Sequence, residues 1–169
     1  MKNLIVKIAI IVTMLVLTAC SPHTMMDHPS VSSEEVFIAE MIPHHQEAVD
    51  SSRLMLSSEN PKVKALAEAI ILAQELEISM MQDWMGQWYA DSDYKITYKN
   101  MMPELTSLEG EAKDKAYLEG MIAHHKGAIE MAKQAQTLDF RAEVLELTKN
   151  IILTQEDEIK QINAILKGL

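Results

Sequence analysis

The sequence contains one helical unit written twice, and this repeat limits the fold more than any other feature. The segment Met-Ile-Pro-His-His-Gln-Glu-Ala-Val-Asp begins at Met41, and Met-Ile-Ala-His-His-Lys-Gly-Ala-Ile-Glu begins at Met121. A second matching pair, Ile-Ile-Leu-Ala-Gln-Glu-Leu-Glu-Ile and Ile-Ile-Leu-Thr-Gln-Glu-Asp-Glu-Ile, begins at Ile70 and Ile151. Each half of the chain is therefore a His-His segment followed by a Gln-x-x-Glu-Ile segment.

All four segments have the periodicity of helices. We predict helices over residues 33–57, 61–89, 107–136 and 140–167. Residues suited to cap them stand at their starts: Ser32 with Glu35, Asn60 with Pro61, Thr106 with Glu109, and Asp139. A short connection inside each half makes a helical hairpin, and the long connector 90–106 lets the second hairpin dock on the first. The expected fold is all-α, a four-helix bundle of two repeated hairpins over residues 33–169.

The first nineteen residues have the pattern of an export signal. Lys2 and Lys7 are followed by an apolar run over residues 8–19 that ends at Cys20. At about 1.5 Å per residue this run spans roughly 18 Å, which is too short for a bilayer core of about 30 Å. The tetrapeptide Leu-Thr-Ala-Cys resembles a bacterial lipobox, which implies cleavage before Cys20, lipidation of its thiol and anchoring to a membrane outside the cytoplasm. A plain secretory signal with an incidental cysteine is the alternative.

Residues 20–32 lack periodicity and contain two prolines, so we expect a flexible tether. Four of its side chains have the chemistry to bind a soft metal: His23, Met25, Met26 and His28. A polar linker with chance His and Met residues explains them equally well.

The helical stripes place one histidine of each pair in the core. The stripe of the first helix is Ile38, Met41, His45, Ala48, Ser52 and Met55, and that of the third is Leu118, Met121, His125, Ala128, Ala132 and Ala135. His44 and His124 lie about 100° around their helices and are expected to be half exposed.

The second and fourth helices bring carboxylates to the same core. Their stripes are Val63, Leu66, Ile70, Ala73, Glu77, Met80 and Trp84, and Leu147, Ile151, Thr154, Glu158 and Ile162. A buried carboxylate costs several kcal/mol unless it is paired. Two interpretations remain open at this point: the two His–Glu pairs only hold the hairpins together, or the repeated imidazoles and carboxylates bind a metal.

Composition favours a soft metal. The chain has 13 Met and 6 His, and a Met stands three residues before each His-His pair. Thioether sulfur together with imidazole, outside the cytoplasm, favours copper, especially Cu(I). Zinc prefers Cys, His and carboxylate ligands. A di-iron bundle needs repeated Glu-His motifs, whereas the spacing from Glu40 to His44 has no counterpart at Gly120.

The paired Met-Ile-x-His-His-x-x-Ala and Gln-x-x-Glu-Ile signatures resemble the family called domain of unknown function 305, which includes CopM-like copper-binding proteins of the bacterial periplasm. The resemblance covers about residues 33–167 and implies a ferritin-like four-helix bundle that binds copper through Met and His. Together the motifs give these candidate metal ligands: Met41, His44, His45, Glu77, Met121, His124, His125, Met131 and Glu158. Gln74 and Gln155 share a face with the two carboxylates and are open candidates. Ser51 stands where family members often carry a second Met, so the two sites are not fully symmetric.

These features predict an exported, lipid-anchored protein that sequesters copper or hands it over. Candidate partners are the membrane, through Cys20, and a copper efflux or delivery protein. A net charge of −10 disfavours nucleic acid as a partner. The sequence lacks a nucleophile with a positioned base, so we expect a binding protein and not an enzyme. The alternatives are a structural or partner-binding helical module without metal and a metal-dependent oxidase.

Overall fold

The computed structural model describes residues 30–169, and it confirms the predicted four-helix bundle. The helices are α1 (Glu34–Arg53), α2 (Pro61–Trp88), α3 (Gly110–Ala135) and α4 (Ala142–Leu166). The predicted export signal, the predicted lipidation site Cys20 and the candidate tether cluster of His23, Met25, Met26 and His28 lie outside the described residues. Within the described part, no helix is both long enough and apolar enough to cross a membrane.

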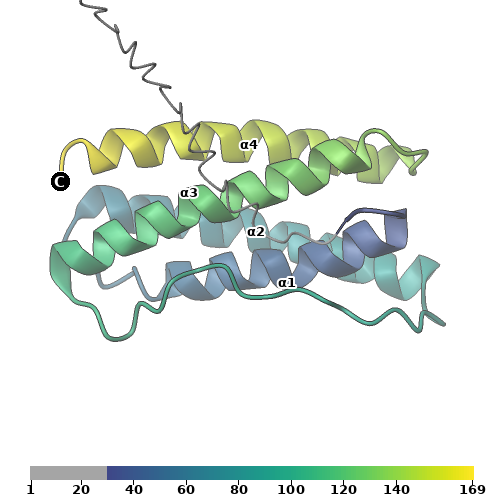
Figure 1. The fold of residues 1–169 in the computed structure, drawn as a ribbon, viewed down its shortest axis with the longest axis horizontal. Coiled ribbons are helices and arrows are strands. Elements are labelled where there is room, and N and C mark those ends of the chain that lie inside the picture. The colour runs from purple at the N-terminus through teal and green to yellow at the C-terminus, as the bar shows by residue number, and fades with distance from the viewer. Residues whose placement is uncertain (1–29) are drawn as a thin grey trace, which may run out of the picture.

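The two hairpins of the repeat are visible as two layers. Helix α1 packs on α2 and α3 packs on α4, and the hairpins meet chiefly through α1 and α3 (Figure 1). Residues 89–109, which we call the crossing loop, lie along the outside of α1 before the chain enters α3 (Figure 1). The two His-His segments therefore face each other across the contact between the hairpins.

Only one of the predicted caps is confirmed as such. The Asn60 side chain accepts a hydrogen bond from the N–H of Lys62, and Pro61 opens α2. Helix α1 is capped by Ser33 and not by Ser32, since the Ser33 hydroxyl accepts from the N–H of Val36. The predicted caps of the other two helices are wrong: α3 and α4 begin after Glu109 and Arg141, and neither side chain makes a capping hydrogen bond.

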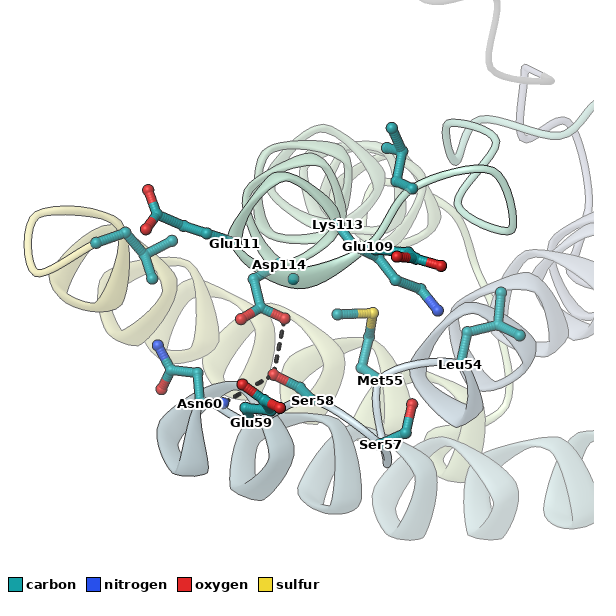
Figure 2. Close-up of a pocket in the computed structure, with 13 residues that line it drawn as sticks. Leu54, Met55, Ser57, Ser58, Glu59, Asn60, Glu109, Glu111, Lys113 and Asp114 are labelled. Carbon is teal, nitrogen blue, oxygen red and sulfur yellow. Dashed lines mark hydrogen bonds between the residues drawn. The ribbon is translucent and has the colours of Figure 1, made fainter.

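An acidic residue at the start of each His-bearing helix instead holds the turn of the opposite hairpin. Asp114 of α3 accepts a hydrogen bond of 2.7 Å from the Ser58 hydroxyl, beside a cavity of about 480 Å³ (Figure 2). Glu34 of α1 accepts from the backbone N–H of Arg141 and from the Tyr89 hydroxyl. Burial alone would raise the pKa of Glu34, but these hydrogen bonds and the Arg141 charge lower it. Glu34 and Asp114 are equivalent positions of the two repeats, so the repeat also includes a pair of contacts between the hairpins.

The core consists of two apolar clusters with polar side chains between them. The first cluster includes Phe37, Ile38, Met41, Met81, Ala128, Met131, Leu147 and Ile151. The second includes Ala48, Leu66, Ile70, Tyr117, Leu118, Met121 and Ile162. The residues between them along the helices contribute what we call the polar layer: His44, His45, Gln74, Glu77, His124, His125, Gln155 and Glu158.

Candidate functional site

Four histidines form the centre of the polar layer. His45 and His125 are completely buried, as predicted. His44 and His124 are completely buried too, so their predicted half exposure is wrong. The crossing loop is the reason: the ring of Tyr98 lies 5.5 Å from that of His44, and its hydroxyl lies 3.4 Å from Nε2 of His124. A loop without periodicity gave no sequence signal that it would cover this face.

The four imidazoles form a row that connects the two hairpins. The ring centroids of His44 and His124 are 3.9 Å apart, across the contact between α1 and α3. Within α1 the centroids of His44 and His45 are 6.2 Å apart, and within α3 those of His124 and His125 are 6.4 Å apart. The structure therefore brings together all four histidines that the repeat singled out.

A carboxylate stands at each end of this row, as predicted. Nε2 of His45 lies 2.8 Å from a carboxylate oxygen of Glu77, and Nε2 of His125 lies 2.7 Å from one of Glu158. Each pair joins the two helices of one hairpin. The side chains of Glu77 and Glu158 are 17% and 9% exposed, so water competes only weakly for these contacts.

Glu77 and Glu158 contact only one of the two ring nitrogens of His45 and of His125. A neutral imidazole that donates its Nε2–H to a carboxylate carries a lone pair on Nδ1. Within residues 30–169, Nδ1 of His45, His124 and His125 has no hydrogen-bond partner. Nε2 of His125 lies close to Glu158 but without hydrogen-bond geometry, so the hydrogen bond to a carboxylate is made by His45 and not by His125. Histidines that bind metals commonly have this arrangement, in which a carboxylate orients the ring and the opposite nitrogen is the ligand.

Sequence reasoning missed a third carboxylate, that of Glu47. It lies 3.3 Å from Nε2 of His124 and accepts hydrogen bonds from the Tyr98 hydroxyl and from the N–H groups of Met101 and Met102. Burial alone would raise its pKa, but these hydrogen bonds lower the pKa to about 2. The equivalent residue of the second repeat is Gly127, so the repeat gave no signal for this position.

The three predicted thioether ligands are buried on both sides of the polar layer. Met41 and Met131 belong to the first apolar cluster and Met121 to the second, and all three are fully buried. Met41 precedes His45 by four residues, and Met121 precedes His125 by four. Side chains at this spacing are neighbours on one helical face. Each core histidine therefore has a sulfur-bearing neighbour on its own helix.

The predicted stripes of α2 and α4 are partly wrong in this layer. Gln74 is 3% exposed and Gln155 is 2% exposed, whereas Met80 is 39% exposed and Thr154 is exposed. The buried positions step from Ile70 to Gln74 and from Ile151 to Gln155, four residues where the predicted stripes took three, as the helical period of 3.6 allows. In the part of the chain that the structure describes, the Oε1 atoms of both glutamines and Nε2 of Gln74 have no hydrogen-bond partner.

Hard ligands alone do not make a metal site here. Among the described residues, no group of three or more His, Cys, Asp or Glu side chains is arranged to hold a metal ion. The thioethers of Met41 and Met121 are the sulfur donors on the same helical faces as His45 and His125. A mixed set of imidazole and thioether donors suits a soft cation such as Cu(I) better than zinc or calcium.

The buried layer should make the metal-free protein sensitive to acid. Burial lowers the pKa of His124 to about 4, despite its hydrogen bond with Glu47. The unfolded chain binds this proton near pH 6.5 and the folded chain only near pH 4, so stability falls as the pH drops through this window. By pH 5 the loss is about 2 kcal/mol, at about 1.4 kcal/mol per pKa unit. Glu47, with its pKa of about 2, adds a further loss below pH 4.5.

Urea unfolding of metal-free protein at pH 7 and pH 5 measures this loss. The variant His124→Gln should remove most of the difference between the two pH values. An equal free energy of unfolding at both pH values in the wild-type protein would contradict the assignment of His124 as neutral in the fold.

The chain is similar to one known protein family and to several solved structures. The family model of DUF305, a domain of unknown function, matches residues 34–166. The structure of CopM in its Cu(I)-bound form is 33% identical over 79% of this chain and 95% of that chain, with a TM-score of 0.72. CopM has also been solved with Ag, with Cu(II) and without metal.

Three other similar proteins have descriptions that name no ligand. A DUF305 fragment from Deinococcus radiodurans is 29% identical over 83% of this chain and all of that chain, with a TM-score of 0.63. A DUF305 protein of Streptomyces coelicolor, described as secreted, is 28% identical over 79% of this chain and 89% of that chain, with a TM-score of 0.70. An uncharacterised protein of Acanthamoeba polyphaga mimivirus is 42% identical over 53 residues, which span 35% of its length. The duplicated His-His hairpins, the four-helix bundle and these matches together show that the chain belongs to the DUF305 family.

Proposed function

We propose that this protein binds copper, with preference for Cu(I), in the polar layer at the centre of the bundle. One observation carries the proposal. Nε2 of His45, His124 and His125 each lies within 3.3 Å of a carboxylate oxygen, and Nδ1 of each has no hydrogen-bond partner among the described residues. For His125 the contact with Glu158 is close but lacks hydrogen-bond geometry, so Nε2 is unpaired as well. An unpaired buried lone pair is costly, so a layer of this kind is suited to a ligand that accepts electron pairs.

The ligand set follows from the contacts. Nδ1 of His45 and Nδ1 of His125 would bind the metal, together with the sulfur atoms of Met41 and Met121 on the same helical faces. Glu77 and Glu158 would orient the imidazoles and accept their Nε2 protons, which revises their role from the direct ligands that the sequence suggested. His44, His124 and Met131 would extend the site across the contact between the hairpins.

The structures of CopM with Cu(I), Cu(II) and Ag support this assignment, because CopM shares the fold and a third of its residues with this chain. We further propose that the protein stores or passes on copper and is not an enzyme. A location outside the cytoplasm, a lipid anchor at Cys20 and a copper efflux or delivery protein as partner complete the proposal. The Streptomyces coelicolor relative, which is described as secreted, supports the location.

A purely structural role remains the competing function, because the His45–Glu77 and His125–Glu158 contacts also tie each hairpin together. Titration of the purified protein with Cu(I) against a competing chelator separates the two. Copper binding should compete with the chelator and raise the melting temperature, because a ligand of the folded state stabilises it. A melting temperature unchanged by Cu(I), with all copper left on the chelator, would leave only the structural role.

A further inference from the structure

The crossing loop is the outer cover of the His44–His124 pair. Both imidazoles are fully buried, and Tyr98 of the loop contacts both. The other ends of the imidazole row are covered by α2 and α4 through Glu77 and Glu158. Moving a helix away would break both apolar clusters, whereas the crossing loop contributes to them only Leu105 and the partly buried Met102 and Tyr89. The crossing loop is therefore the part of the cover over the histidines that can move with the smallest loss of apolar packing.

Hydrogen bonds to carboxylates of α1 hold this loop in place. Glu40 is fully buried and accepts from the Tyr94 hydroxyl at 2.6 Å and from the N–H and hydroxyl of Thr97 at 2.6 and 2.9 Å. Seven residues further along the same face, Glu47 accepts from Tyr98 and from two backbone N–H groups. Of residues 89–109, only Leu105 is fully buried, and Ile96 is 57% exposed. Leu105 belongs to the second apolar cluster and Met102 packs against it, so apart from Tyr89 at its start the apolar packing of the loop lies at its far end. Between Tyr94 and Met101 the loop is attached by hydrogen bonds to Glu40 and Glu47, which water can replace.

The far end of the loop rests against α3 at a glycine. A Cβ atom added to Gly120 would lie 2.4 Å from Cδ of Pro103, so the loop approaches α3 closely only because this residue has no side chain. Gly120 is the repeat equivalent of Glu40, and Gly127 is the equivalent of Glu47. The two repeats therefore differ at the positions where one helix holds the loop and the other makes room for it.

A groove of about 620 Å³ lies between α1 and the loop. Its lining includes Glu47, Asp50, Tyr98, Met102 and Glu104. Glu47 and Tyr98, which line the groove, also contact His124. The inner wall of the groove is therefore the Glu47–Tyr98 contact, and the imidazole lies directly behind it. The carboxylates attract a cation to the groove, and the thioether of Met102 favours a soft one.

We propose that this groove is the route by which the copper cation reaches the polar layer, and that the crossing loop is its gate. In the closed state Tyr98 donates to Glu47 and separates the groove from His124. Opening breaks this hydrogen bond and moves Pro103 away from Gly120, while Glu47 remains beside His124 to hold the ring. The proposal rests on the proposed copper binding and adds the path and the element that controls its rate.

Two variants open the gate without replacing a proposed ligand. Gly120→Ala forces Pro103 to move, and Tyr98→Phe removes the hydroxyl that bonds to Glu47 while keeping the ring. Gly86→Ala is the matched control, because a Cβ at this helical glycine meets nothing within 4 Å. Each protein is mixed with the Cu(I) complex of bicinchoninate, and the loss of the complex absorbance is followed in time. We expect Gly120→Ala and Tyr98→Phe to take up Cu(I) roughly tenfold faster, which corresponds to about 1.4 kcal/mol. Gly86→Ala should match the wild type.

A second measurement uses metal-free protein. Diethyl pyrocarbonate modifies neutral imidazoles that it can reach, and mass spectrometry locates the modified residues. His44 and His124 should react several times faster in Gly120→Ala and in Tyr98→Phe than in the wild type or Gly86→Ala.

The two measurements separate the gate from the copper site. If wild-type protein takes no Cu(I) from bicinchoninate, the proposed function fails, while the modification rates still show whether the loop gates the histidines. If wild-type protein takes up Cu(I) but both opened variants match it in uptake and in modification, the gate is wrong and copper binding stands.

Discussion

Replacing both His45 and His125 with glutamine is expected to lower the affinity for Cu(I) by at least a hundredfold, or about 3 kcal/mol. Loss of a residue that merely orients a ligand typically costs 10- to 100-fold in metal affinity, and these two residues are proposed as ligands themselves. Glutamine retains an N–H group that can donate to Glu77 or Glu158, so neither carboxylate is left buried without a partner. Competition with a Cu(I) chelator measures the change.

A matched pair of substitutions tests whether the effect belongs to the bundle. His23→Gln with His28→Gln makes the same chemical change in the segment before residue 30. These two substitutions should leave the tightest Cu(I) site intact. Retention of wild-type affinity in the His45/His125 variant, with its loss in the His23/His28 variant, would move the site from the bundle to the tether.

Replacing both Met41 and Met121 with leucine is expected to weaken Cu(I) binding by at least tenfold, with a much smaller effect on Cu(II). Thioether sulfur is a soft ligand that stabilises Cu(I), whereas imidazole serves both oxidation states. Leucine has nearly the volume of methionine, so each substitution should cost less than about 1.5 kcal/mol of stability. Titration with each oxidation state and thermal unfolding of the metal-free variant measure the two effects separately.

Met81→Leu is the control for this pair. Met81 is fully buried in the same apolar cluster as Met41 but is not beside a histidine of its own helix. Its replacement should change stability about as much as Met41→Leu and leave the Cu(I) affinity unchanged. Equal losses of Cu(I) affinity in Met81→Leu and Met41→Leu would show that packing, and not a sulfur ligand, explains the effect.

The repeat made the architecture and half of the site predictable. Helical periodicity fixes which residues share a face, and the duplication showed that His45 and His125 occupy the same core position. Glu77 and Glu158 followed from the second matching segment, and the structure places each beside its predicted histidine. Pattern reasoning works for these residues because each contact lies within one hairpin and is made twice.

The other half of the site depends on contacts that occur once. The crossing loop has no periodicity and no counterpart in the repeat, so its cover over His44 and His124 could not be read from the pattern. Glu47 takes its role from this loop, since four donors converge on it: Tyr98, His124 and the N–H groups of Met101 and Met102. The sequence contained one sign of this asymmetry: glycine stands in the second repeat where the first has Glu40 and Glu47. The meaning of this difference becomes clear only from the position of the loop in the structure.

X-ray absorption spectroscopy of the Cu(I)-loaded protein tests the central claim most directly. We predict both nitrogen and sulfur neighbours around copper, with the sulfur contribution reduced in the Met41→Leu/Met121→Leu variant and the nitrogen contribution reduced in the His45→Gln/His125→Gln variant. A copper environment of nitrogen and oxygen alone, unchanged in both variants, would contradict a copper site built from the buried imidazoles and thioethers of the bundle.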